Sequence, residues 1–125
     1  MKQTKNARME KLAMELIDLL IEHGMYIDVT IYVNNEMWSA THGRNNIERH
    51  TPKQNTFFVT DNVDVSKRIE YANPDTITLT FEGPLYAALN YYDQSHIRDK
   101  LDKLFLRYHL YAEQGHAWSM ALYPV

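Results

Sequence analysis

Apolar side chains recur at helical spacing in two long stretches of the chain. In residues 7–23 they stand three or four positions apart, at Met9, Leu12, Ala13, Leu16, Ile17 and Leu20. This spacing predicts one buried face of an α-helix, and Gly24 is typical of the position just beyond a helix end. Residues 95–115 predict a second helix, with Ser95 as its N-cap. Its buried stripe would comprise Ile97, Leu101, Leu104, Phe105, Tyr108 and Ala112.

Strict alternation of apolar and polar residues predicts strands elsewhere. In residues 26–33 every second side chain is aliphatic, which is the pattern of a strand with one buried face. Asn34-Asn35 predicts a two-residue hairpin turn after it, because asparagine tolerates positive φ. Such a turn would place Ile31 opposite Trp38, so that the apolar faces of both strands coincide. Further strands are expected at residues 57–59, 76–82 and 118–122.

Two short segments complete the expected elements. Residues 65–72 predict a helical turn capped by Asp64, with a strand as the alternative. Gly83-Pro84 predicts a short helix through Tyr91, because proline is favoured at the first helical position. Strands in runs with helices at the flanks are typical of an α+β domain. We therefore expect residues 1–125 to form one domain, an antiparallel sheet of about five strands with two long amphipathic helices on one face, a two-layer sandwich.

Composition narrows the class of protein. The 125 residues carry a net charge of −3 and include no cysteine, which excludes disulfides, thiolate nucleophiles and cysteine metal ligands. The acidic balance argues against a protein devoted to nucleic acid. No apolar run is long enough to span a bilayer, and the N-terminal region lacks the pattern of a signal peptide. A cytoplasmic protein with no membrane partner is the expectation.

Residues 42–55 are polar and show no periodicity, which predicts a long loop. Loops of this length are often either functional or disordered, so a mobile loop without fixed geometry is the alternative to a functional one. The loop carries cations and a histidine that could bind an anion or nucleic acid: Arg44, Arg49, His50 and Lys53. Ile47 is its only aliphatic residue, so we expect Ile47 to pack onto the sheet edge and to set Arg44, Arg49 and His50 around a concave, anion-tolerant site.

Signals for catalysis are weak. A metal-dependent hydrolase using His42, His50 and Asp61 is one alternative, although these residues lack the tight spacing of recognisable metal sites. No serine stands in a nucleophile-elbow pattern, and the four glycines are too far apart for a phosphate-binding loop. The sequence therefore favours a protein without catalytic activity, and it predicts neither a cofactor nor a bound metal.

Tyrosine is the unusual component, with nine residues. Tyrosine suits half-wet interfaces, because it has a large apolar body and a polar tip. On the sheet face opposite the helices we expect Tyr26, Tyr32, Thr78 and Thr80 to form a semi-polar interface. The sequence thus predicts a small binding or interaction domain that forms a homodimer and can bind another protein. Anion or nucleic-acid binding through residues 42–55 is the second alternative.

Overall fold

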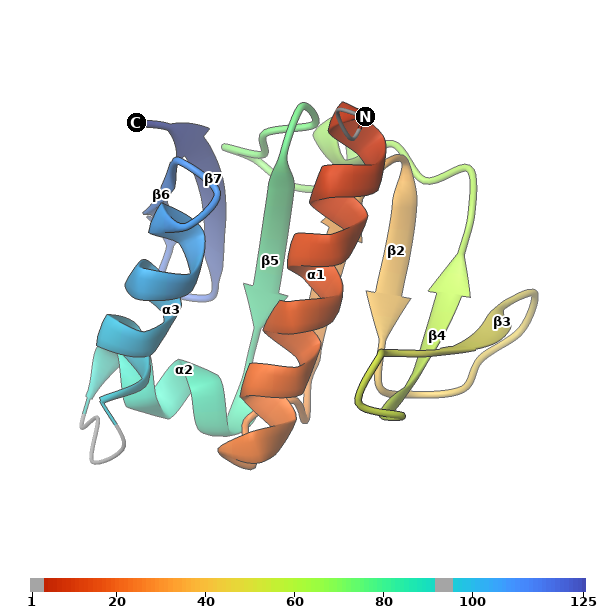
Figure 1. Ribbon diagram of the computed structural model, residues 1–125, viewed down its shortest axis with the longest axis horizontal. Helices are drawn as coiled ribbons and strands as arrows, with labels where there is room; N and C mark the ends of the chain where they lie inside the picture. The colour runs from red at the N-terminus through yellow and green to blue at the C-terminus, as the bar shows by residue number, and fades with distance from the viewer. Residues whose placement is uncertain (1–3, 92–95) are drawn as a thin grey trace.

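Seven strands form one antiparallel sheet in the computed structural model, which describes residues 4–91 and 96–125 (Figure 1). The strands are β1 (Val29–Val33), β2 (Glu36–Ser39), β3 (Ile47–His50), β4 (Thr56–Thr60), β5 (Ile77–Phe81), β6 (Leu110–His116) and β7 (Ser119–Pro124). Their order across the sheet is β3-β4-β2-β1-β5-β7-β6. Three local hairpins, β1–β2, β3–β4 and β6–β7, supply most of the strands. The predicted α+β class is confirmed, and the sheet has two strands more than the expected five.

Two long helices lie on one face of this sheet, and a shorter one lies at the end of the strands below α3 (Figure 1). They are α1 (Lys5–Glu22), α2 (Gly83–Asn90) and α3 (Ile97–Leu106). The predicted stripe of α1 is buried in the core together with apolar residues of β1 and β5. The Thr4 hydroxyl caps the start of α1 by accepting from the Ala7 amide at 3.1 Å, and Gly24 with φ of +67° follows its end. The first helix is therefore confirmed, and it starts at Lys5, two residues before the expected range.

The hairpin of β1 and β2 has the predicted register. Asn34 and Asn35 form its turn with φ of +52° and +60°, as the primed turns of tight hairpins require. Ile31 pairs with Trp38, and both side chains are fully buried in the core on the helix side of the sheet. The strands expected near residues 57–59, 76–82 and 118–122 are present as β4, β5 and β7.

Strand β3 lies within the segment expected to be a loop. It pairs with β4 along all four of its residues. Its sequence lacks the usual alternation because Arg49 occupies an inward position that an apolar residue would normally fill. Ile47 lies on the same face of β3 as Arg49. It is nevertheless 64% exposed, so the prediction that it anchors the segment onto the sheet edge is wrong.

The second long helix ends earlier than predicted. Helix α3 stops at Leu106, and His109 adopts a φ of +59°, which turns the chain back into β6. Leu110 and Ala112 face the core from a strand. Ala112 follows Tyr108 by four residues, a spacing that fits a helical stripe as well as one face of a strand. The predicted helix through Gly115 is therefore wrong in its second half. The predicted cap, Ser95, lies outside the described residues.

The connection between β4 and β5 covers part of the other sheet face. Its one regular element is the 3₁₀ turn η1 (Val65–Lys67), capped as predicted by Asp64, whose carboxylate accepts from the Ser66 amide at 3.0 Å. Val63 and Val65 form a second apolar cluster with Tyr32 of β1.

Within the described residues, no helix combines the length and the hydrophobicity that crossing a membrane requires.

Candidate functional site

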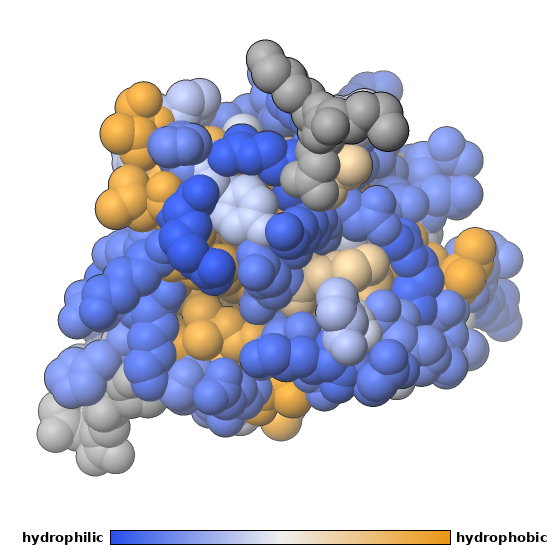
Figure 2. Space-filling model, in the orientation of Figure 1, coloured by the Kyte–Doolittle hydropathy of each residue, from blue (hydrophilic) through white to orange (hydrophobic). Residues whose placement is uncertain are grey.

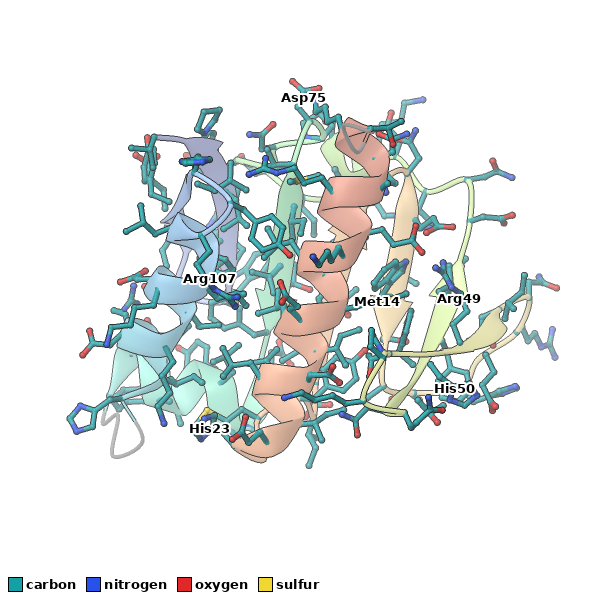
Figure 3. The ribbon with its side chains drawn as sticks, in the orientation of Figure 1. Met14, His23, Arg49, His50, Asp75 and Arg107 are labelled. Atoms are coloured by element: carbon teal, nitrogen blue, oxygen red, sulfur yellow. The ribbon has the colours of Figure 1, made fainter. Side chains whose placement is uncertain are left out.

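Arg49 is held on the helix-covered side of the sheet (Figure 3). Its guanidinium forms ion pairs with Glu10 of α1 and, at 3.5 Å, with Glu36 of β2. The same group lies 5.2 Å from the ring centre of Trp38 and 5.6 Å from that of Phe57. Arg49 therefore covers an aromatic pair where the helices leave the sheet open, and its charge is already neutralised by two carboxylates.

The other predicted anion-binding residues point elsewhere. His50 lies on the opposite side of β3 from Arg49, where its ring is 3.3 Å from the Glu48 carboxylate and 3.1 Å from the Thr56 hydroxyl. Arg44 is exposed in the turn before β3. Lys53 lies in the β3–β4 turn beside α1. The expected concave site around Arg44, Arg49 and His50 is therefore not formed, because strand pairing sends neighbouring side chains to opposite faces.

The metal alternative also lacks its site. Within residues 4–91 and 96–125, no three side chains of His, Asp or Glu come together in a way that could hold a metal ion. His42 packs edge-on against Phe58 at 5.1 Å, whereas His50 contacts Glu48 and Thr56. Asp61 is exposed in the turn after β4. The structure does not bring His42, His50 and Asp61 together.

The four residues of the predicted tyrosine and threonine interface do not form one exposed surface. Tyr26 belongs to the core on the helix side, because it precedes β1 rather than extending it. Burial raises the pKa of its hydroxyl. Tyr32 and Thr78 face the opposite side but are buried, since Tyr32 packs in the second apolar cluster and the Thr78 hydroxyl accepts from the Asn73 amide at 2.9 Å. Of the four predicted residues only Thr80 remains partly open.

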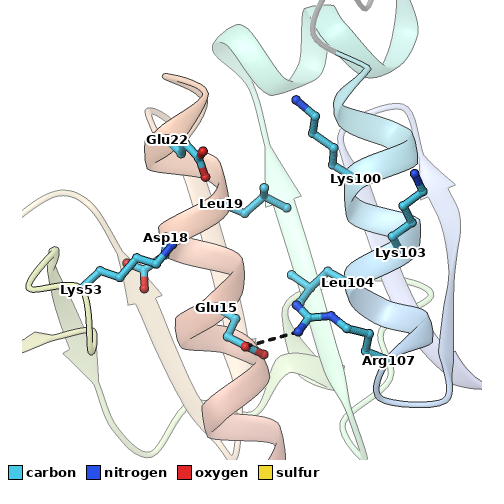
Figure 4. A pocket seen from close by; sticks show the side chains of 9 residues that line it. All are labelled: Glu15, Asp18, Leu19, Glu22, Lys53, Lys100, Lys103, Leu104 and Arg107. Atoms are coloured by element: carbon cyan, nitrogen blue, oxygen red, sulfur yellow. Dashed lines mark ion pairs between the residues drawn. The ribbon is translucent and has the colours of Figure 1, made fainter.

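A groove between α1 and α3 brings together residues that the sequence reasoning left apart (Figure 4). We call it the interhelical groove; its volume is about 350 Å³. One wall is acidic and is formed by Glu15, Asp18 and Glu22 of α1. The facing wall is basic and is formed by Lys100, Lys103 and Arg107 of α3. Leu19 and Leu104 lie between the walls, and Lys53 stands at the outer rim.

The space-filling view shows the apolar part of this groove from outside. Hydrophobic surface is visible between the helices and is framed by hydrophilic side chains (Figure 2). Charges three and four residues apart on a helix lie on one face, so the charged rows of both helices run beside the groove. Asp18 points toward Lys53 rather than toward α3 (Figure 4). A single ion pair bridges the walls among the described residues, between Glu15 and Arg107 at 3.8 Å.

At the end of the groove where Glu15 pairs with Arg107, hydrogen bonds fix the position of Glu15. Tyr108 donates its hydroxyl to the Glu15 carboxylate, and the Arg8 guanidinium donates to the Tyr108 carbonyl oxygen at 2.6 Å. Burial, followed by the bond to Glu15, raises the pKa of Tyr108 to about 12. Tyr108 therefore stays protonated and remains a donor across the physiological range.

Asp18 fixes the outer rim. Its Oδ1 accepts from the Thr51 hydroxyl at 2.5 Å and from the Asn55 amide at 2.6 Å. Thr51 in turn accepts from the Asn55 backbone amide at 3.1 Å. These bonds tie the β3–β4 turn to α1 and place Lys53 beside the acidic wall. The buried Asp18 carboxylate, which accepts both bonds, therefore holds the β3–β4 turn in one position.

Near the C-terminal end of α1 fewer of the groove's charges form ion pairs within the described residues. Lys100 approaches the His23 ring at 3.3 Å, and in the part of the chain that the structure describes Lys53 and Lys103 make no ion pair. The groove can therefore offer cations from α3 and a carboxylate from Glu22 to one ligand. The equal spacing of the charges on both helices was the signal in the sequence, but nothing there indicated that the helices were neighbours.

Neither a known protein-family model, nor a curated protein, nor a solved structure matches this chain. The groove, its charges and its apolar floor are thus the basis for inferring what the protein does.

Proposed function

We propose that this chain is a small binding domain without catalytic activity of its own, and that it binds an amphipathic helical segment of a partner protein in the interhelical groove. The observation that supports this is the pair of oppositely charged walls on either side of an apolar floor. Helix-in-groove recognition uses apolar anchors along one face of the bound helix. Leu19 and Leu104 are the residues here that such anchors would contact. In keeping with the location expected from the sequence, we propose that this binding takes place in the cytoplasm.

The charges limit the partner further. The acidic wall favours lysine or arginine along one edge of the bound helix, and the basic wall favours aspartate or glutamate along the other. A ligand of one sign, such as a nucleic acid, would meet repulsion from Glu22 or from Lys103. From Glu15 to Glu22 the wall is about 10 Å long, so two to three turns of a helix would be in contact.

Synthetic peptides test this. The probe is a helical peptide with leucines on one face, glutamates along one edge and lysines along the other, and the controls carry only lysine or only glutamate at both edges. Calorimetry should show at least about tenfold tighter binding of the mixed-charge peptide, which corresponds to 1.4 kcal/mol. Equal binding of all three peptides, or binding of none, would overturn the proposal.

Charge reversal locates the binding. Lys103→Glu should weaken the mixed-charge peptide, and replacing the peptide's glutamates by lysine should restore part of the affinity. Lys67→Glu is the matched control, because Lys67 is exposed in η1 on the other side of the sheet. If both variants weaken binding equally, the effect is one of net charge and the groove is not the site.

Self-association is a second candidate, and exposed apolar residues beside an edge strand favour it. Leu106 is 59% and Val125 is 78% exposed. The Val125 amide donates to the His109 carbonyl oxygen at 3.0 Å. Val125 and Leu106 therefore both lie near the start of β6. Because β6 ends the sheet, one side of its backbone has no partner strand within the described residues, and such edges pair readily with a second copy.

Light scattering after size-exclusion chromatography tests the homodimer. The expected mass is twice that of the chain, and Leu106→Glu should reduce it to that of one chain by placing a charge in the interface. A single-chain mass for the unmodified protein at high concentration would refute the dimer.

A further inference from the structure

A row of hydroxyl side chains crosses the sheet on the face opposite the helices. The register pairs Ser39 with Thr30, Thr30 with Thr80, and Thr80 with Ser119. Four neighbouring strands, β2, β1, β5 and β7, thus each contribute one hydroxyl. Neighbouring strands are about 4.8 Å apart, so the row is regular and about 14 Å long.

Part of this row is open to solvent. The adjacent row, which contains Tyr32 and Thr78, is buried, and Tyr32 packs against the β4–β5 connection. Beyond it lies a trough of about 470 Å³ whose lining includes Thr30, Ser39 and Thr80. Ser119 is buried below the surface.

The hydroxyls in the trough have free hydrogen-bonding capacity. Within the described part of the chain, neither the Thr30 nor the Thr80 hydroxyl has a protein partner. The Ser39 hydroxyl donates to the Thr41 carbonyl oxygen at 3.1 Å, which leaves its lone pairs to accept. Each hydroxyl can therefore bond to a group from outside the chain.

Two carboxylates and an indole complete the trough. Asp28 precedes β1 and Glu82 follows β5, and both line the same space. Trp118 lies in the β6–β7 turn, is 39% exposed, and stacks on His116 with 4.7 Å between ring centres and 5° between ring planes. The Phe81 amide donates to the Trp118 carbonyl oxygen at 2.8 Å, which fixes the turn against β5. The indole is therefore held as a platform at one side of the trough.

We infer that this trough is a binding site for a neutral carbohydrate chain. The carboxylates only accept hydrogen bonds, and the hydroxyls both donate and accept, so the matching ligand is rich in hydroxyl groups. An exposed indole can stack against the apolar face of a sugar ring. No lysine, arginine or histidine is among the residues that line the trough, and Asp28 and Glu82 would repel an anionic ligand. The site is separate from the interhelical groove, because the sheet lies between them.

Titration of the full chain with defined probes tests the inference. Neutral oligosaccharides of glucose and of N-acetylglucosamine are the probes; an oligolysine peptide and an acidic oligogalacturonate are the comparisons. Nuclear magnetic resonance should show shifts at the Trp118 indole N–H and at the Thr30 and Thr80 amides with one of the neutral sugars. The shifts should be insensitive to salt, because no charge is neutralised.

Variants place the ligand. Trp118→Ala and Thr80→Val should each weaken the sugar by about tenfold, and Thr60→Val is the matched control, since Thr60 lies on the same sheet face outside the trough. Equal loss in Thr60→Val would overturn the assignment. Binding of oligolysine alone, lost at high salt, would identify an electrostatic site for cationic peptides and would refute a carbohydrate site. The absence of shifts with every neutral sugar at millimolar concentration would refute it as well.

Discussion

Removing the Asp18 carboxylate is expected to release the β3–β4 turn from α1. Asp18 is buried and accepts from both Thr51 and Asn55, so Asp18→Ala leaves a hydroxyl and an amide without their acceptor. The Thr51 hydroxyl also accepts from the Asn55 backbone amide. The perturbation therefore reaches the backbone of the turn that carries Lys53.

The magnitude follows from the two bonds. A hydrogen bond to a charged group contributes roughly 1.5–3 kcal/mol, and the buried donors left behind add to the loss. The desolvation of the carboxylate, which the variant no longer requires, offsets part of it. We expect the free energy of unfolding to fall by about 2–3 kcal/mol, which lowers the Tm by roughly 6–12 °C for a chain of this size.

Urea denaturation followed by circular dichroism measures this change. Asp18→Asn is the conservative variant, and it should lose only about 1 kcal/mol because its amide oxygen still accepts. Asp61→Ala, at an exposed turn, should change the free energy of unfolding by less than about 0.5 kcal/mol. If Asp18→Ala is no more destabilising than Asp61→Ala, the bonds to Thr51 and Asn55 do not hold the turn against α1.

Three further expectations concern single side chains. Because the pKa of Tyr108 is raised in the folded chain, its contribution to the free energy of unfolding is complete below pH 10 and is lost as the pH rises toward 12. In a pH series of urea denaturations, Tyr108→Phe should therefore lose less stability between about pH 10 and pH 12 than the unmodified chain. Asn35→Val places a β-branched residue at a φ of +60° and should lower the free energy of unfolding by about 1–2 kcal/mol, whereas Asn35→Gly should not; equal loss in both would contradict the turn geometry. Arg49→Ala should lower the free energy of unfolding by about 1–2 kcal/mol, because it removes two carboxylate partners and two aromatic contacts. Arg49→Lys should recover only part of this loss, because an ammonium group lacks the planar stacking surface. An unchanged midpoint in thermal or chemical denaturation would mean that Arg49 does not cover the core.

The elements with strong periodicity could be predicted from the sequence alone. Helix α1 and the β1–β2 hairpin depend on local spacing and on the turn residues Asn34-Asn35, so both follow from short-range rules. Strand β3 could not be found in this way, because an edge strand needs little apolar content and its inward residue is Arg49. The end of α3 could not be predicted from local spacing, because Tyr108 and Ala112 are four residues apart and fit a helical stripe as well as one face of a strand.

The candidate site depended on tertiary neighbours that no local pattern reports. The sequence showed that Lys53 lies in a polar segment and that α1 carries an acidic row. It did not show that α1 and α3 are adjacent, or that Asp18 turns inward to hold the turn that bears Lys53. Thr80 was assigned correctly to the sheet face opposite the helices, whereas the covering of Tyr32 and Thr78 depended on the β4–β5 connection.

The order of the strands implies unequal local stability within one sheet. Strand β3 has a single partner and mostly exposed side chains, whereas β5 has partners on both sides and is almost entirely buried. Hydrogen exchange in the native state should therefore proceed through opening of the β3–β4 hairpin at a much lower free energy than through β5. Because Lys53 stands in the turn of that hairpin, the outer rim of the interhelical groove belongs to a unit that we expect to be less stable than the centre of the sheet. A bound partner that contacts Lys53 should slow exchange in β3 more than in any central strand, and equal slowing throughout the sheet would argue against such a unit.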